Sequence, residues 1–218
     1  MREATHFRLT TGVRVHSEFC YRRKDAILFQ TELRRFQIDA NEETPVNHIQ
    51  RKVENIIEPQ PVTEGAGVRL KRSIGTRSLD YLDPFLLLDH FASPNREDYE
   101  RGFPLHPHRG IETVTYVLTG EVHHKDHLGN SGSIGAGDVQ WMTAGGGIMH
   151  EEMPQVRPEG INGFQLWVNL PARLKMTRPR YQGIEASEIP SVEIEGGTKI
   201  RVITGTVAHR STGPRQAR

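Results

Sequence analysis

Cysteine is nearly absent from this sequence, because Cys20 is the only one among 218 residues. A single cysteine excludes an internal disulfide, and it also excludes the structural zinc sites that combine several cysteines at short spacing. A chain without disulfides fits a reducing compartment. We therefore expect a cytoplasmic protein, or a nuclear one if its source is eukaryotic.

Long apolar runs and an excess of either charge are also missing. No window approaches the roughly 20 apolar residues that a membrane helix needs, and the N-terminus leads into no apolar segment of a secretory signal. The formal net charge is +1, from 28 basic and 27 acidic side chains. This balance gives no electrostatic argument for a nucleic-acid or membrane partner.

Two common catalytic motifs are absent as well. The glycine run at 145–147 lacks the Lys-Ser/Thr pair of a phosphate-binding loop, and no Gly-x-Ser-x-Gly elbow is present. These absences argue against P-loop nucleotide chemistry and against an α/β-hydrolase triad.

Glycine and proline are abundant, with 21 and 13 residues that fall between short apolar runs. Frequent glycine and proline between short apolar runs favour strands over helices. No helix long enough to connect parallel strands is evident in the sequence. A closed antiparallel β-barrel is the economical all-β architecture. The expected strands are 68–74, 84–91, 113–118, 121–124, 139–142, 162–170 and 200–203, and the expected turns include 59–67 and 132–137.

The two ends of the chain differ from its middle. Residues 1–47 carry little pattern, and residues 206–218 are polar and basic without apolar periodicity. We expect a poorly patterned N-terminal extension and a frayed basic tail, because disorder concentrates at termini. One domain is expected at 48–205.

A His-Pro-His motif and a His-Glu-Glu motif bracket the strand-rich middle of the chain. Because side chains alternate faces along a strand, His106 shares a face with His108, and His150 shares one with Glu152. About 40 residues separate the two motifs, which leaves room for two or three strands and their hairpins. Antiparallel pairing can bring three imidazoles and one carboxylate together inside a barrel. The pattern predicts a mononuclear metal site.

The choice of metal and of carboxylate stays open on these residues alone. Three histidines and a carboxylate suit Fe(II), and also Mn(II), Ni(II), Cu(II) or catalytic zinc. Glu112 shares the parity of the first histidine pair if the strand is unbroken, so it is an alternative ligand or a residue that orients one. Gly110 permits a bulge, which would invert that parity. His123, His124 and His127 fit neither strand face and are expected to be structural or solvent-exposed.

Longer motifs surround these histidines. They are Arg72-Ser73-Ile74-Gly75, Leu82-Asp83-Pro84-Phe85-Leu86-Leu87-Leu88-Asp89, Gly102-Phe103-Pro104 with His106-Pro107-His108-Arg109-Gly110, Gln140-Trp141-Met142-Thr143-Ala144-Gly145, His150-Glu151-Glu152-Met153-Pro154 and Gln165-Leu166-Trp167-Val168-Asn169-Leu170. Together they resemble the pirin family of the cupin superfamily over roughly residues 48–205.

The resemblance implies a cupin (jelly-roll) β-barrel, the N-terminal barrel of the pirin arrangement, with the second barrel largely missing from this chain. It implies that His106, His108, His150 and Glu152 hold the metal, usually iron in this family. These are the four side chains that strand parity selects. The resemblance also favours Glu152 over Glu112 as the carboxylate ligand.

The resemblance further implies an oxygenase similar to the quercetin 2,3-dioxygenase activity described for pirins, with a small planar flavonol-like substrate. Glu152 is then expected to be the base that takes the substrate hydroxyl proton. Phe103, Trp141 and Met142 are expected to wall an apolar pocket. The alternatives are an iron-dependent transcriptional cofactor with a regulatory protein partner, as described for eukaryotic pirins, and an inactive truncated remnant.

Overall fold

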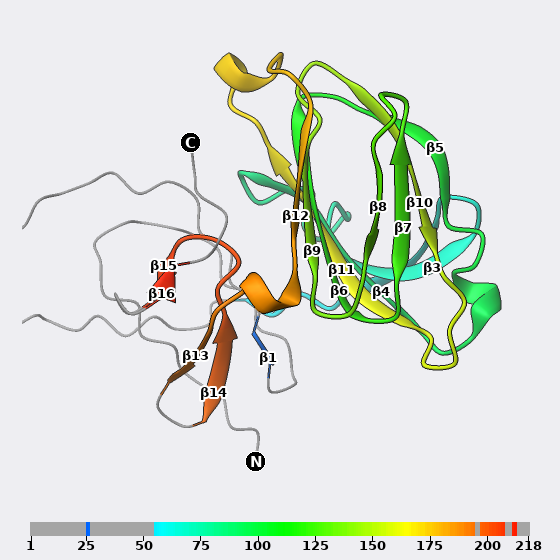
Figure 1. The fold of residues 1–218 in the computed structure, drawn as a ribbon, viewed down its shortest axis with the longest axis vertical. Helices are drawn as coiled ribbons and strands as arrows, with labels where there is room; N and C mark the ends of the chain where they lie inside the picture. The colour runs from blue at the N-terminus through cyan, green and yellow to red at the C-terminus, as the bar shows by residue number, and fades with distance from the viewer. Residues whose placement is uncertain (1–24, 27–54, 195–196, 208–210, 213–218) are drawn as a thin grey trace, which may run out of the picture. The chain divides into compact units, whose positions relative to one another are not determined.

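The computed structural model describes residues 25–26, 55–194, 197–207 and 211–212 (Figure 1). Contacts divide the chain into two compact units, one of residues 57–188 and one of residues 1–56 with 189–218. Most of the extension expected at 1–47 and part of the tail expected at 206–218 lie outside the described residues. The predicted domain boundaries at 47 and 205 stay a prediction.

The unit at 57–188 is built from two antiparallel sheets. The larger has the strand order β12-β9-β6-β11-β4-β3-β2 and the smaller has the order β5-β10-β7-β8. The two sheets face each other in Figure 1 and confirm the expected all-β barrel. The strands are β2 (Gln60–Glu64), β3 (Val68–Ile74), β4 (Phe85–Ser93), β5 (Phe103–His108), β6 (Ile111–Thr119), β7 (Val122–Asp126), β8 (Ser131–Ile134), β9 (Val139–Thr143), β10 (Ile148–Pro154), β11 (Ile161–Asn169) and β12 (Arg180–Ile184).

Short 3-10 turns are the only helical elements among the described residues. They are η1 (Arg96–Asp98), η2 (Ala172–Leu174) and η3 (Ala186–Glu188). Within the same part of the chain, no helix has the length and apolar character to cross a membrane.

Two apolar clusters pack the sheets together. The first joins Val68, Phe91 and Val117 of the large sheet to Val122 and Ile134 of the small one. The second joins Ile111 and Met142 of the large sheet to Ile148 of the small one, next to Ala144. Both clusters draw on both sheets, so burial of apolar surface is what holds the two sheets face to face.

Most of the expected strands are present, with ends that differ by a few residues. The expected number of strands between the two motifs was too low, because four strands, β6 to β9, lie there. The turns expected at 59–67 and 132–137 were wrong where they overlap β2 and β8. Both strands are largely exposed, and in β8 only Ile134 is buried. Such short polar strands lack the apolar alternation that reveals a strand in a sequence.

The other unit contains two small sheets. β13 (Ser191–Ile194) pairs antiparallel with β14 (Thr198–Arg201), and β1 (Asp25–Ala26) pairs with β14 in parallel. β15 (Thr206–Val207) pairs with β16 (Ser211–Thr212) inside the tail that was expected to fray. The strand expected at 200–203 overlaps the end of β14.

Gly163 on β11 is expected to tolerate no side chain. A Cβ at this position would lie 2.6 Å from the Phe91 ring and 2.7 Å from the Tyr116 carbonyl oxygen. We expect Gly163→Ala to lower the free energy of unfolding by about 1–3 kcal/mol, as overpacking does in cores, measured by urea denaturation. Gly183→Ala is the matched control, because its Cβ would meet no atom within 4 Å. Equal losses in the two variants would contradict this packing.

Candidate metal centre

Two neighbouring strands of the small sheet carry the predicted metal ligands. β5 and β10 are antiparallel, and His150 lies directly opposite His106. The side chains that face the interior are buried, with exposed fractions of 0% for His150, 4% for Glu152 and 7% for His108. The same-face pairs expected from strand parity are therefore present, and the two strands that carry them pair directly.

Three imidazoles converge at this point of the sheet. One ligand nitrogen from each of His106, His108 and His150 lies within 4.8 Å of the others. The ring centroids are 4.5 to 4.9 Å apart. The Nε2 atoms of His106 and His108 are 3.0 Å apart. Two nitrogens that bind one ion at about 2.1 Å and at about 90° to each other have this separation.

The protonation of these rings suits metal binding. The Nδ1–H of His106 donates to the Pro104 carbonyl oxygen at 2.9 Å, which leaves the lone pair on Nε2. Burial, together with the neighbouring imidazoles, lowers the pKa of His108 to about 4. Burial also lowers the pKa of His150. His108 and His150 are therefore neutral near pH 7, the state in which imidazole binds metals.

His150 supplies the sharpest test of whether the site fits an ion. Both of its ring nitrogens are buried and neither has a hydrogen-bond partner. Buried polar atoms are nearly always satisfied, so a fully buried imidazole with two unpaired nitrogens needs an explanation. A divalent ion among the three histidines would satisfy one of these nitrogens. The donor set supports a metal cofactor without selecting the metal.

Glu152 faces the same interior, where hydrogen bonds hold its carboxylate. The Gln165 Nε2 donates to both carboxylate oxygens, at 3.0 and 2.9 Å, and the Thr115 hydroxyl donates at 3.2 Å. Burial raises the pKa of Glu152, but the His150 imidazole and the Gln165 amide more than offset this effect. The net pKa lies below its ordinary value, and the group is ionised near pH 7.

Gln165 and Trp167 were not among the predicted site residues. The Trp167 Nε1–H donates to the Gln165 Oε1 at 3.2 Å, which orients the amide so that its Nε2 faces Glu152. The Trp167 ring meets His108 edge-on, with centroids 5.0 Å apart. The two side chains share one face of β11 and brace both Glu152 and His108. The alternation of residues along 162–170, which puts Gln165 and Trp167 on one face, was the sequence feature that could have identified them.

Glu112 is not brought to the three imidazoles. Its carboxylate accepts a hydrogen bond from the Thr143 hydroxyl at 2.6 Å. Trp167, which contacts His108, is paired with Thr113, so Glu112 lies on the opposite face of the large sheet. Gly110, with a φ of 71°, separates β5 from β6 and breaks the parity that linked Glu112 to the histidines. A role for Glu112 in orienting a histidine stays a prediction.

The three predicted pocket residues occupy different places. Phe103 lies opposite Glu152 and against the His106 ring, with centroids 6.3 Å apart. Met142 is fully buried in the second apolar cluster, and Trp141, the next residue on β9, faces the other side of the sheet. Their role as pocket walls stays a prediction.

Comparisons with known proteins place these features in a wider group. The family model described as "Pirin" matches residues 67–168. A pirin-like protein of Caulobacter vibrioides is 51% identical over 164 residues, which cover 75% of this chain and 59% of that protein. A Pseudomonas aeruginosa protein with a provisional name as a quercetin 2,3-dioxygenase is 54% identical over 145 residues, 66% of this chain and 51% of that protein.

The structural comparison agrees with the sequence comparison. A crystal structure of quercetin 2,3-dioxygenase from Acinetobacter baumannii superposes with a TM-score of 0.63 at 42% identity, and covers 74% of this chain and 58% of that one. The chain spans about half to three-fifths of the length of these relatives. The barrel is thus of the cupin type that the sequence motifs implied.

His150→Ala is expected to abolish metal binding, because it removes the fully buried imidazole at the centre of the group. Elemental analysis of the protein after reconstitution with Fe(II) should fall from about one ion per chain to almost none. His123→Ala is the control, since His123 is exposed and pairs with Glu121 at 2.8 Å. Full metal content in His150→Ala would contradict the assignment.

Gln165→Leu is expected to lower the free energy of unfolding by about 1–3 kcal/mol near pH 7, because the buried carboxylate of Glu152 loses its main donor. Glu152 has a lowered pKa in the folded state, so its contribution is present at neutral pH and is lost as the pH falls through that pKa. The difference in unfolding free energy between Gln165→Leu and the wild type should therefore become smaller in acid. Urea unfolding across a pH series measures it, with Trp167→Phe expected to show a smaller loss. If the difference in unfolding free energy between Gln165→Leu and the wild type stayed the same in acid, Gln165 would not be what stabilises the ionised Glu152 carboxylate.

Proposed function

We propose that this chain, which belongs to the pirin family of the cupin superfamily, is a metal-dependent dioxygenase that acts on a flavonol-like substrate. The observation that carries the proposal is the group of three converging histidines with both His150 nitrogens unpaired. The relatives named for quercetin 2,3-dioxygenase activity support the choice of reaction.

Four side chains would hold the metal, with His106, His108 and His150 as nitrogen ligands and Glu152 as the carboxylate ligand. We propose Fe(II), with Mn, Ni, Cu and Zn as alternatives, because this mixed nitrogen and oxygen set suits all of them. When bound, the ion would supply Lewis-acid and redox chemistry to the reaction.

Glu152 would move the proton. Its lowered pKa keeps the carboxylate free of a proton until the substrate arrives, and Gln165 and Thr115 hold it in place. The substrate O–H bond would break and an O–H bond to a Glu152 carboxylate oxygen would form. Burial of the carboxylate excludes bulk water as a competing donor.

The substrate and the setting of the reaction are part of the same proposal. A small planar aromatic molecule is the class that the names of the relatives suggest. The cytoplasm is the proposed compartment, because the single cysteine leaves no internal disulfide to be kept oxidised. A regulatory protein partner is the alternative if the iron site has no turnover.

An oxygen-uptake assay tests the proposal. The protein is reconstituted anaerobically with Fe(II), and quercetin is added with oxygen. We expect uptake by the wild type, and a decrease of about 100-fold or more in His106→Ala and in Glu152→Gln, the size of a general-base effect. Bound iron without uptake would refute the oxygenase and favour the regulatory alternative. Failure to bind any metal would favour an inactive remnant.

A further inference from the structure

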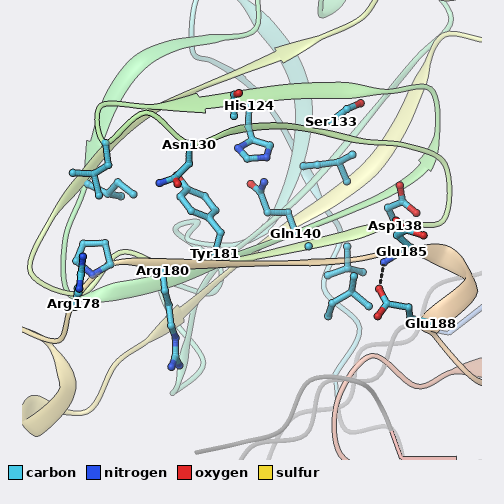
Figure 2. A pocket seen from close by; sticks show the side chains of 18 residues that line it. His124, Asn130, Ser133, Asp138, Gln140, Arg178, Arg180, Tyr181, Glu185 and Glu188 are labelled. Atoms are coloured by element: carbon cyan, nitrogen blue, oxygen red, sulfur yellow. Dashed lines mark hydrogen bonds between the residues drawn. The ribbon is translucent and has the colours of Figure 1, made fainter.

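A cavity of about 930 Å³ lies in the gap between the two sheets (Figure 2). Residues of β8 line it on the side of the small sheet, and residues of β9 and β12 line it on the side of the large sheet. β8 and β12 are the last strands of their sheets, and among the described residues each pairs with one strand only. The cavity is therefore flanked by two strand edges that no described strand covers.

A free strand edge favours one kind of ligand. It presents a row of backbone N–H and C=O groups, and an extended peptide supplies partners for them at the matching spacing. β12 is five residues long. At about 3.3 Å per residue, an added segment of about seven residues would cover β12 and reach slightly beyond both of its ends.

The charges at the two ends of β12 have opposite sign. Figure 2 shows Arg178 at the end of the cavity where β12 begins, and Glu185 and Glu188 at the end where β12 finishes. Asp138 lies beside these two glutamates, and Arg180 points away from the cavity. A peptide segment along β12 would thus meet a positive charge at one end and three negative charges at the other.

The carboxylates at the negative end are held in place by the backbone. Asp138 accepts hydrogen bonds from the N–H groups of Gly135 and Ala186, at 2.9 and 2.7 Å. Glu188 accepts one from the N–H of Glu185 at 2.8 Å. These donors are neutral, so they orient the carboxylates without cancelling their charge. A basic side chain would find the negative end already arranged.

The middle of the cavity suits side chains that alternate along an extended segment. Ile134, Ile148 and Ile184 contribute apolar surface, and Gln140 is directed into the cavity in Figure 2. Gly183 is exposed in the middle of β12, and a Cβ at this position would meet no atom within 4 Å. Side chains of a neighbouring strand therefore have room opposite β12.

We propose that β12 binds an extended segment of a partner protein as an additional antiparallel strand in the gap between β8 and β12. β12 already pairs antiparallel with β9, and antiparallel pairs are the commoner kind. In this orientation the segment begins beside Glu185 and Glu188 and ends beside Arg178. It therefore carries a basic residue first and an acidic residue about six positions later, with apolar side chains facing the cavity between them.

This binding is separate from the reaction proposed above, because it uses the outer edge of β12 and none of the four residues proposed to hold the metal. Peptide binding and oxygen uptake can therefore be measured independently of each other.

Two peptides with opposite order of charge test the orientation. We expect acetyl-Lys-Thr-Val-Thr-Val-Thr-Glu-amide to bind the wild type, measured by calorimetry. The peptide with Lys and Glu exchanged is expected to bind about fivefold more weakly or worse, because each charge then meets its own sign. Equal or tighter binding of the exchanged peptide would overturn the proposal. So would a wild type that binds neither peptide at about 1 mM.

Arg178→Glu tests the positive end. We expect it to weaken binding of the first peptide by about threefold to tenfold, and to regain affinity when the peptide's Glu is replaced by Lys. Arg101→Glu is the control, because it changes the net charge equally at an exposed residue that does not line the cavity. Equal losses in the two variants would indicate unspecific attraction and overturn the proposal.

Methylation of the peptide's backbone nitrogens tests whether a strand is added. Alternate residues of a strand point their N–H groups to opposite edges, so methylation of every second nitrogen blocks one edge only. We expect one of the two methylation patterns to weaken binding by about tenfold or more, and the other by about twofold. Equal effects of the two patterns would overturn the proposal.

Gly183→Phe tests the place of binding, because its ring would fill the space beside β12. We expect it to weaken binding of the first peptide by about tenfold, with Gly183→Ala, the control, within about twofold of the wild type. Wild-type affinity in Gly183→Phe would overturn the proposal. Light scattering tests a second copy of this chain as the occupant. A wild-type dimer that Gly183→Phe converts to a monomer would overturn the proposal of a partner protein.

Discussion

The pairing of β5 with β10 is the constraint on which the rest of this molecule depends. Because His150 lies opposite His106, a single antiparallel register brings residues 44 positions apart in the chain to adjacent places in the barrel. A slip of one residue would turn His150 and Glu152 to the outer face together. The apolar clusters that join the two sheets therefore protect the register as well as the stability of the fold.

Several polar side chains are buried in the barrel, and they differ in whether other side chains form hydrogen bonds with them. Asp89 accepts two hydrogen bonds from Arg72, at 2.7 and 2.8 Å, across the pair of strands β3 and β4. Glu152 is held by Gln165 in a similar way. His150 has no such partner, although it is more deeply buried than either. The buried ring without a hydrogen-bond partner thus belongs to the group of three histidines for which metal binding is proposed.

Strand parity in the sequence was enough to select the three converging histidines, because alternation along a strand is a property of the backbone alone. For Glu112 parity left two alternatives open, an unbroken strand or a break at Gly110, and the structure has the break, because the chain passes from one sheet to the other there. Gln165 was missed because its importance lies in a contact with Glu152, which lies on a strand of the other sheet. His124 was expected to be structural or exposed, and only the three-dimensional packing shows its stacking on Tyr181 beside Glu152.

The position of β5 in its sheet has a consequence for how an ion is taken up. β5 is an edge strand with one hydrogen-bonded neighbour, so it can fray at a lower free-energy cost than β10, which has two. His106 and His108 lie on the edge strand β5, and His150 lies on β10, which is hydrogen-bonded on both sides. An ion shared among them would act as a cross-link that fastens the edge, and the kinetics of metal loading would follow the opening of a single strand.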